Sequence, residues 1–503
     1  MSHYDRREFL SMITTGAAAG ILGPMLAIPQ KCYGARDSKP NVLFIAVDDL
    51  RPELGCYGRK QIISPNIDKL ASQGLVFERA YCQQAICMSS RGSLLSGCRP
   101  DTGNIWTNRN VRNLLPETVF LPQHFKNNGY HTVGIGKIYH GGHEDALSWS
   151  EPSHYPESYK YVVRTKAGRA LVERIRKEAM SSGKPDPYRN IPENLRRGMP
   201  YECLDVPDNE LVDGEIADYA IKTLQRTKDR PFFLGVGFIR PHLPFVAPKK
   251  YWDLYDPERI ELADNPFAPA GVPQIAMHNS SELRTQYVGV PKSGYIGDEL
   301  SRQLIHGYYA CVSYIDAQIG RLMNELDRLG LRDNTVVVLW GDHGWHLGDH
   351  GLWNKHTNFE TATRSPLIMS APGMKTRGKK TSSLVEFVGI YPTLCKLADL
   401  PLPSHLEGTS FAKLLDDPQL ELRKAAFSQY PRGRIMGYSM RTDRYRYTEW
   451  RDRKTGQLHV RELYDHQKDP KENVNVAKRP DYSQIIKELA IVASKGWRST
   501  IVR

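Results

Sequence analysis

The chain has 503 residues, of which 40% are hydrophobic and 25% charged, a composition typical of a globular protein rather than a fibrous or disordered one. Its formal net charge of +12 favours an anionic partner, either nucleic acid or an acidic polysaccharide. No block of lysine and arginine is long enough for a nucleic-acid arm, and no apolar run reaches the roughly 20 residues that span a bilayer. We therefore expect neither nucleic-acid binding nor stable membrane insertion. The eight cysteines are scattered and form neither a zinc pattern nor a disulfide framework.

Residues 1–35 are predicted to be a targeting segment. The paired Arg6 and Arg7 precede a run of small apolar residues from Ile13 to Ile28. This order is typical of a twin-arginine signal, which carries folded proteins across a bacterial inner membrane. We therefore expect the twin-arginine export machinery as a partner and a periplasmic or secreted protein. The alternative is a weakly apolar N-terminal helix.

Residues 41–47 form a continuous apolar run, as a strand buried on both faces would. The run ends in Asp48 and Asp49. Adjacent carboxylates at the carboxyl end of a central strand repel each other, and they usually indicate a bound cation. The alternative is a polar turn in which an aspartate caps a helix.

The segment from Cys87 to Gly97 predicts a loop leading into a helix, with Cys87 at the N-terminus of that helix and Arg91 one turn later. Backbone N–H groups and the helix dipole favour an anion there. A thiol at such a position is expected to be unusually acidic and reactive. The alternative is that Cys87 is a buried, small apolar residue.

Further elements follow in chain order. Helices are predicted to start at residue 64 and to cover 115–128, 212–225, 300–329, 383–397 and 482–494. Strands are predicted at 131–136, 231–238 and 335–340, and short alternating strands at 426–430, 436–440, 445–450 and 460–464. Residues 147–207 are polar and rich in Pro, Ser, Arg and Lys, so we expect an irregular excursion over the mouth of a site.

Strands that alternate with helices predict an α/β fold: a large mixed, mostly parallel sheet sandwiched by helices. The alternating short strands after residue 400 predict a smaller C-terminal α+β subdomain with an antiparallel sheet. We place the catalytic domain at residues 38–410 and the C-terminal subdomain at 411–503.

Polar residues cluster where the predicted strands end, and the carboxyl ends of parallel strands meet at one edge of a sheet. Lys137 and His140 follow the strand at 131–136, His242 stands between two prolines after the strand at 231–238, and Asp342 and His343 follow the strand at 335–340. The alternative for each of these side chains is a purely structural role, either exposed to solvent or packed in the fold. Together they suit anion binding and proton transfer.

Oxygen donors dominate the strand ends. Asp48, Asp49 and Asp342 would hold a hard divalent cation, Ca²⁺ rather than Zn²⁺, because cysteine and multiple-histidine ligation is missing. With Arg91, and with the lysines Lys137 and Lys355, such a cation would form a pocket for a tetrahedral anion.

The segment Cys87-Met88-Ser89-Ser90-Arg91, followed by Ser96-Gly97, resembles the sulfatase signature. Ser89 stands where that family usually has Pro, sometimes Ala. The resemblance covers nearly the whole chain after the signal and is closest to the iduronate 2-sulfatase branch. The residues that carry the closer match are Asp48-Asp49, Gly136-Lys137 with His140, 241–245, 342–344, 347–351 with Lys355, 430–432 and 435–442.

The resemblance implies a site. In the family, a maturation enzyme oxidises the signature cysteine, here Cys87, to formylglycine, whose hydrate attacks the sulfate ester. The residues implied to surround Ca²⁺ are Asp48, Asp49, Asp342, His343 and the formylglycine made from Cys87. Arg91 would stabilise the hydrate.

The resemblance also implies the residues that handle the substrate. Lys137, His242 and Lys355 would bind the sulfate, with His242 or Lys355 protonating the leaving alcohol. His140 would assist elimination of the sulfate from the enzyme. His356 stands where the iduronate enzyme has a tyrosine near the sugar carboxylate, and it is expected to bind the substrate.

Three functions are compatible with the sequence. The first is an exported sulfatase that hydrolyses O-sulfate esters of a sulfated polysaccharide or its oligosaccharides. The second is a phosphonate or phosphodiester hydrolase of the same alkaline-phosphatase-like superfamily. The third is a non-catalytic sulfoglycan-binding protein in which Ser89 blocks formylglycine formation.

Overall fold

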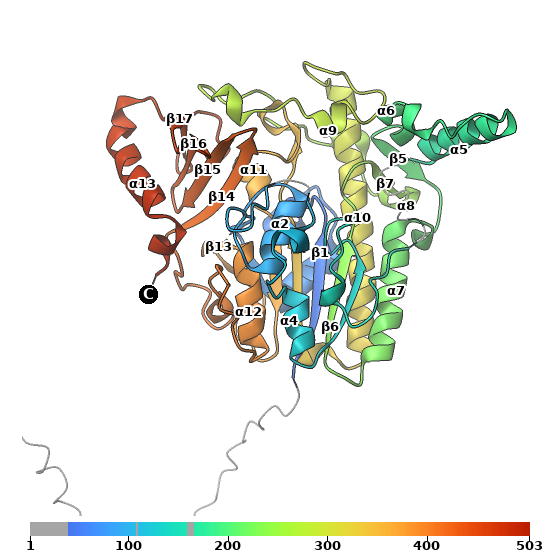
Figure 1. Cartoon of the computed structure of the whole chain (residues 1–503), viewed down its shortest axis with the longest axis horizontal. Coiled ribbons are helices and arrows are strands. Elements are labelled where there is room, and N and C mark those ends of the chain that lie inside the picture. The colour runs from blue at the N-terminus through green and yellow to red at the C-terminus, as the bar shows by residue number, and fades with distance from the viewer. Residues whose placement is uncertain (1–38, 107–108, 157, 159–164, 503) are drawn as a thin grey trace, which may run out of the picture. The chain divides into compact units, whose positions relative to one another are not determined.

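The computed structural model describes residues 39–106, 109–156, 158 and 165–502, all within one compact unit, residues 39–503 (Figure 1). The predicted signal at residues 1–35 lies outside the described residues. A search of the described helices finds none long and apolar enough to cross a membrane.

A seven-stranded sheet in the order β12-β2-β11-β8-β1-β6-β4 organises this unit. The strands β4, β6, β1 and β8 are parallel neighbours, and β11 runs antiparallel to β8 and β2. Their bounds are β1 Asn41–Val47, β2 Leu75–Phe77, β4 His131–Gly136, β6 Phe232–Phe238, β8 Thr335–Gly341, β11 Leu367–Ser370 and β12 Lys379–Thr381. The predicted mixed, mostly parallel sheet is confirmed.

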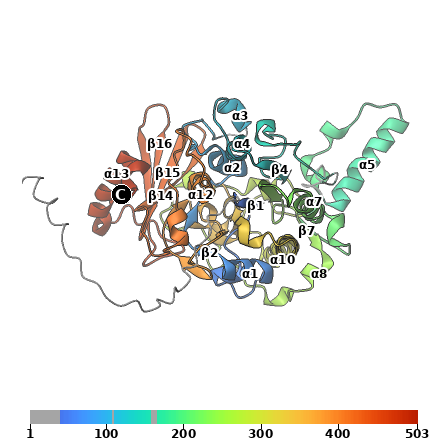
Figure 2. The same ribbon diagram turned by 90° about the horizontal axis from the view of Figure 1, so that it is seen from below.

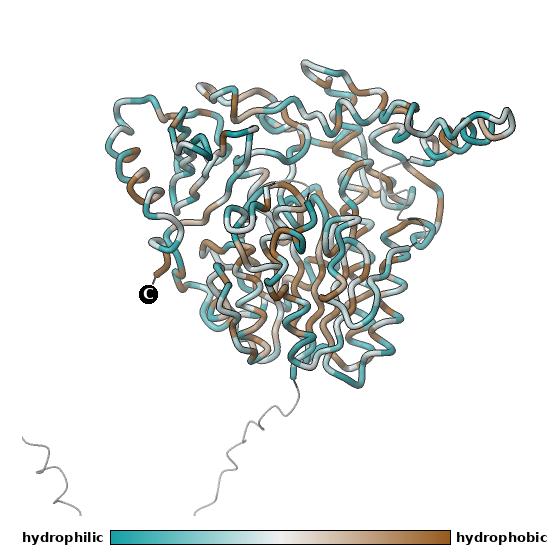
Figure 3. The backbone as a smooth tube through the Cα atoms, in the orientation of Figure 1, coloured by the Kyte–Doolittle hydropathy of each residue, from teal (hydrophilic) through white to brown (hydrophobic). Residues whose placement is uncertain are grey.

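Helices cover both faces of the sheet, which explains the continuous apolar strands (Figure 2). One face packs on α1 Pro65–Gln73, α7 Val212–Thr227 and α10 Asp298–Arg328, and the other on α2 Cys87–Ser96, α4 Leu121–Asn127 and α12 Ile390–Leu397. In β1, Leu43 and Ile45 enter the first core, whereas Val42 and Phe44 enter the second. Figure 3 shows the hydrophobic segments concentrated in these central strands.

The C-terminal part is a four-stranded antiparallel meander, as predicted. Its strands are β14 Ala425–Arg432, β15 Ile435–Thr442, β16 Tyr445–Asp452 and β17 Leu458–Asp465. The helix α13, Ser483–Lys495, packs Leu489 against Met440 and Tyr447 of the meander in a small separate core.

Several local predictions are wrong. The predicted irregular excursion contains the helix α5, Lys166–Ser181, as well as α6 Glu193–Arg197 and β5 Tyr201–Leu204. The polar residues of α5 are strong helix formers, and the Thr165 side chain caps its first turn by accepting from the Gly168 N–H. In Figure 1 this helix extends away from the sheet. Polarity there reflects an exposed helix rather than irregular chain.

Two predicted helices are shorter than expected. The helix predicted at 115–128 begins only at Leu121, because Pro116 starts a turn and Pro122 occupies the first helical turn, where its missing N–H costs nothing. The helix predicted at 383–397 begins at Ile390, because Val385 and Glu386 instead pair as β13 with β3, Ala80–Tyr81.

Three strands of the main sheet were missed by the sequence analysis. The strands β2, β11 and β12 were not predicted, since each has only three or four residues and no clear period. Short strands at a sheet margin are specified by their neighbours rather than by local pattern.

The meander is joined to the main sheet by a buried ion network centred on Arg446, which is 1% exposed. Its Nε donates to Glu472 Oε1 at 2.6 Å and its Nη2 to Glu360 Oε2 at 2.5 Å. Glu360 begins α11, Glu360–Thr363, outside the meander, and also accepts from the Tyr81 hydroxyl at 2.9 Å. One guanidinium therefore neutralises carboxylates from two parts of the chain.

We predict that Arg446→Met lowers the free energy of unfolding by about 3 kcal/mol, because it removes the guanidinium shared by two carboxylates and leaves Arg441 beside Glu360 and His466 beside Glu472. Urea unfolding followed by circular dichroism measures this loss. The matched control is Arg174→Met, whose side chain is 68% exposed and pairs with the equally exposed Glu178. An equal loss in the two variants would contradict the network's role.

Candidate active site

The structure brings the predicted strand-end residues together. The strands β8, β1, β6 and β4 are adjacent and parallel, so Asp342, Asp48, His242 and Lys137 all emerge at one edge of the sheet, the upper edge in Figure 1. The N-terminus of α2 places Cys87 at the same edge.

Three carboxylates, of Asp48, Asp49 and Asp342, are completely buried there. Arg91 Nε donates to Asp342 Oδ2 at 2.8 Å and its Nη2 to Asp48 Oδ1 at 3.3 Å, while Lys137 Nζ donates to Asp48 Oδ2 at 2.5 Å. Burial alone would raise the pKa of Asp48, but Lys137, His242 and Arg91 bring that pKa well below its ordinary value. Asp48 is therefore held ionised.

Asp49 is less fully compensated. Burial raises its pKa despite the Lys355 ammonium, whose Nζ lies 3.1 Å from both carboxylate oxygens. Its backbone adopts φ +59°, a left-handed conformation that costs a non-glycine residue about 1–2 kcal/mol. Strain of this kind clusters at functional sites. The residue thus combines an unfavourable charge, which a bound cation would offset, with an unfavourable backbone conformation.

Cys87 begins α2 as predicted, and its Sγ lies 3.3 Å from His343 Nε2 and 3.9 Å from Asp49 Oδ1. The predicted acidic thiol is wrong. Burial, together with the charge of Asp48, raises the thiol pKa well above its ordinary value, and the nearby lysines do not offset this. The unmodified cysteine is therefore a poor nucleophile in this environment.

His343 offers a lone pair to the same space. Its Nδ1 lies 3.0 Å from the Gly344 carbonyl oxygen, to which it donates, and its Nε2 lies 3.4 Å from Asp49 Oδ1 and 3.6 Å from Asp342 Oδ1. Two overlapping sets of ligand atoms, Asp49–Cys87–His343 and Asp48–Cys87–Asp342, each lie within 4.8 Å of one another. Buried carboxylate oxygens that share so small a space fit a hard divalent cation.

Two basic side chains, those of Lys355 and His242, lie beside Asp49. His242 Nδ1 donates to the Leu243 carbonyl oxygen at 2.7 Å, so Nε2 faces the site. That nitrogen lies 3.2 Å from Glu282 Oε1 and 3.9 Å from Asp49 Oδ2. Glu282, which also accepts from Lys355 Nζ at 2.9 Å, was missed by the sequence analysis. It lies on the four-residue helix α9, Ser281–Arg284, where no strand end or motif marks it.

The two remaining candidates lie at the margin of the site. His140 is half-buried, and burial and Lys137 lower its pKa to about 3, so its imidazole is neutral. His356 is also half-buried, its ring centroid lies 5.8 Å from that of Tyr430, and its carbonyl oxygen accepts from Arg432 Nη2 at 2.6 Å. Because Tyr430 and Arg432 belong to β14, the C-terminal meander contributes to this margin.

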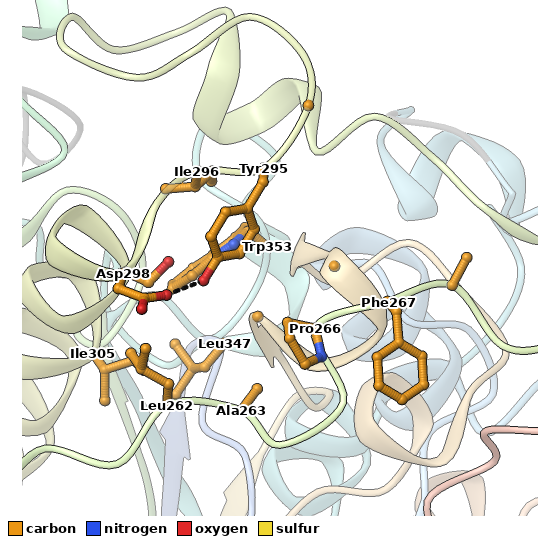
Figure 4. A pocket seen from close by; sticks show the side chains of 15 residues that line it. Leu262, Ala263, Pro266, Phe267, Tyr295, Ile296, Asp298, Ile305, Leu347 and Trp353 are labelled. Atoms are coloured by element: carbon orange, nitrogen blue, oxygen red, sulfur yellow. Dashed lines mark hydrogen bonds between the residues drawn. The ribbon is translucent and has the colours of Figure 1, made fainter.

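A separate pocket of about 320 Å³ has Trp353 in its lining (Figure 4). It is lined mainly by apolar residues such as Leu262, Ile296 and Leu347, with a hydrogen bond from the Tyr295 hydroxyl to Asp298. Its described lining contains none of the predicted site residues, so its chemistry is not that of the strand-end cluster.

The fold and the strand-end cluster define a class of α/β hydrolases in which buried carboxylates, lysines and an arginine surround a residue at a helix N-terminus. The chain belongs to the sulfatase family: the model described as Sulfatase matches residues 40–400. A second model, N-sulphoglucosamine sulphohydrolase, C-terminal, matches residues 348–495. The chain is therefore a sulfuric ester hydrolase.

Among curated relatives, human iduronate 2-sulfatase is 36% identical over 518 residues, covering 87% of this chain and 90% of that protein. The structure of BT4656 with its substrate D-glucosamine-2-N,6-O-disulfate has a TM-score of 0.73 at 21% identity, covering 91% of this chain and 97% of that one. The phosphonate monoester hydrolase of Agrobacterium radiobacter has a TM-score of 0.68 at 23% identity, covering 91% and 95%. These two structures share the fold.

His278 ties the α9 segment to the Lys355 backbone. Its Nε2 donates to the Lys355 carbonyl oxygen at 2.8 Å, and its Nδ1 accepts from the Ser280 N–H at 2.9 Å. Burial, and then Arg432, lower the pKa of His278 to about 4. A proton on Nδ1 would displace the Ser280 N–H, so this geometry requires the neutral ring.

We predict that His278 makes folding stability depend on pH between about 4 and 6.5. The unfolded chain binds the proton more tightly, so this contribution is complete above pH 6.5 and is lost as the pH falls. Between pH 7.5 and pH 5 the wild type should lose about 2 kcal/mol more than His278→Gln, as measured by urea unfolding at both values. Equal losses in the two proteins would contradict the neutral imidazole.

Proposed function

We propose that this protein is an exported sulfatase that hydrolyses O-sulfate esters of a sulfated polysaccharide or its oligosaccharides, as iduronate 2-sulfatase does for its own substrate. The observation that carries the proposal is the position of Cys87, at the start of α2 and within 4 Å of both Asp49 and His343. Three positively charged side chains, those of Arg91, Lys137 and Lys355, lie at the same edge of the sheet.

Cys87 is proposed to be converted to formylglycine by a maturation enzyme. The raised thiol pKa supports this, because the unmodified side chain is a weak nucleophile. When present, the hydrated aldehyde would supply the hydroxyl that attacks sulfur. Arg91, fixed between Asp48 and Asp342, would orient that hydroxyl from the next turn of α2.

The residues proposed to hold a cation are Asp48, Asp49, Asp342, His343 and the modified Cys87. The donor set favours Ca²⁺, since carboxylate oxygens outnumber the single imidazole. A bound divalent cation would neutralise the carboxylates and polarise a sulfate oxygen. Asp49, whose pKa burial raises despite Lys355, would gain from that neutralisation.

The sulfate group is proposed to lie between Lys137, Lys355 and His242. Both ammonium groups donate to carboxylates at the site and have further N–H bonds for an anion. His242 Nε2 faces the same space and would donate a proton to the leaving alcohol, with Lys355 as the alternative donor. His140, held neutral, would accept a proton when the sulfate leaves.

The sugar is proposed to contact His356 at the rim. The same rim carries Tyr430 and the guanidinium of Arg432, which suits a uronic acid carboxylate. The net charge of +12 also favours a polyanionic glycan. The names of two relatives, iduronate 2-sulfatase and the structure bound to a glucosamine disulfate, support a glycan substrate.

Two alternatives remain for the same site. The fold shared with a phosphonate monoester hydrolase favours the second of the functions considered above, a phosphonate or phosphodiester hydrolase. The third, a non-catalytic sulfoglycan-binding protein, is favoured by Ser89, which is buried in α2 and whose hydroxyl has no hydrogen-bond partner among the described residues. Formylglycine analysis and a comparison of ester substrates separate the three.

We propose the same division of the chain into three parts that the sequence predicts. Residues 1–35 would be a twin-arginine signal that delivers the folded protein to the periplasm or the exterior. Residues 38–410 would carry the catalytic chemistry. Residues 411–503 would form the subdomain whose Tyr430 and Arg432 reach the rim of the site.

We predict that the Cys87 peptide of protein purified from its native host has the mass of formylglycine, and that Cys87→Ala lowers kcat on sulfate esters at least about 10⁴-fold without unfolding the chain. Peptide mass spectrometry, ester assays and circular dichroism test this. The control is Cys203→Ala, at an exposed cysteine. An unmodified thiol in the native protein would favour the binding protein, and full activity of Cys87→Ala would refute the mechanism.

We predict that chelation lowers the melting temperature and that added Ca²⁺ restores it. At a Ca²⁺ concentration one hundredfold above Kd, binding should stabilise the folded state by about 2.7 kcal/mol. Asp342→Asn should abolish the response, whereas Asp229→Asn, at an exposed position, should keep it. Differential scanning calorimetry measures both. A response to Zn²⁺ but not Ca²⁺ would overturn the choice of cation.

A further inference from the structure

Glu282 reaches the site from outside the strand ends. It lies on α9, in the excursion between β7, Phe245–Pro248, and α10. Neighbouring contacts fix this segment: Leu283 is 1% exposed, and Arg284 donates to the carbonyl oxygens of Pro291 and Gly294, each at 2.6 Å. These contacts therefore hold the Glu282 carboxylate in a fixed position.

Its contacts are with the two residues proposed to bind sulfate. Glu282 Oε1 accepts from Lys355 Nζ at 2.9 Å and lies 3.2 Å from His242 Nε2. The side chain is 13% exposed, and Oε2 is buried without a hydrogen-bond partner among the described residues. An anion bound between Lys355 and His242 would therefore lie next to a fixed negative charge.

Glu282 also belongs to a group of ligand atoms with Asp49 and His242 that lie within 4.8 Å of one another. A second metal ion there is disfavoured, because the Lys355 ammonium already lies 3.1 Å from Asp49 and 2.9 Å from Glu282. The carboxylate acts on the anion pocket through charge rather than through a metal.

The charge of Glu282 changes the total charge that a bound anion meets in the site. Asp48, Asp49, Asp342 and Glu282 supply four negative charges, and Arg91, Lys137 and Lys355 supply three positive charges. His242 adds a fourth positive charge when its Nε2 carries the proton proposed for the leaving alcohol. In either case, loss of the Glu282 charge makes the site one unit more positive, which favours a doubly charged ester over a singly charged one.

We propose that Glu282 determines specificity by disfavouring doubly charged esters, so that the pocket selects sulfate esters over phosphate monoesters. The inference rests on the proposed function of the same site. Its direction does not depend on the metal, because a negative charge a few ångströms from the anion repels two charges twice as strongly as one. Glu282 contacts the sulfate-binding residues, and it acts as a specificity residue through them.

The test compares two substrates with the same leaving group, phenyl sulfate and phenyl phosphate, at pH 8, where the phosphate is doubly charged. Glu282→Gln keeps the shape and removes the charge, and Glu282→Asp keeps the charge. The control is Glu261→Gln, at an exposed glutamate of the same excursion. We expect Glu282→Gln to raise the phosphate-to-sulfate ratio of kcat/KM at least about tenfold. The Asp variant and the control should retain the wild-type ratio.

Binding provides a second readout that needs no turnover. In the Cys87→Ala background with Ca²⁺ present, calorimetry should show that Glu282→Gln tightens phenyl phosphate more than phenyl sulfate. Unchanged ratios in both assays, or an equal change in Glu282→Asp, would overturn the role of the charge. Failure of the proposed function looks different, because the wild type itself would then hydrolyse no sulfate ester.

Discussion

The site depends on holding three carboxylates without solvent at the ends of two adjacent strands. Asp48 and Asp49 follow β1, and Asp342 follows its neighbour β8, so the parallel register forces like charges together. Buried charges of one sign are costly unless cations lie within contact distance. Arg91 and Lys137 meet this requirement for Asp48 and Asp342, which ties α2 and β4 to the central strands. Asp49 is less fully compensated than Asp48, and Cys87, His343 and Lys355 lie around its carboxylate.

The same constraint explains why a cysteine at this position favours modification. A helix N-terminus ordinarily promotes a thiolate, but burial, and then the charge of Asp48, oppose a further negative charge, and the thiol pKa rises. A nucleophile based on a neutral hydroxyl avoids that penalty until it reacts. The environment that would disable a thiol is thus suited to the formylglycine proposed for Cys87.

Much of this arrangement could be predicted from the sequence, since continuous apolar runs indicate buried parallel strands, and residues that follow such strands must meet at one edge. Asp48, Lys137, His242 and Asp342 were found in this way. Glu282 could not be found, because it lies on a four-residue helix whose position is set by the packing of Leu283 in the main core and by the bonds of Arg284 to the loop that follows. The thiol pKa was mispredicted for a related reason: helix position is local information, whereas the burial of the thiol and the charge of Asp48 depend on parts of the chain that are distant in sequence.

Residues at the strand ends and residues in the connecting segments are proposed to have different roles, in the chemistry and in substrate selection. Residues proposed for the chemistry are fixed by the main sheet and α2, whereas Glu282 comes from the excursion before α10, and Tyr430 and Arg432 come from the meander. The meander is held to the main sheet by Arg446 between Glu360 and Glu472. Because α9 contacts Lys355 and His242 directly, changes in an excursion can alter the charge that the anion meets while the strand-end carboxylates stay in place. Substrate preference can therefore change through the connecting segments while the proposed catalytic residues keep their positions.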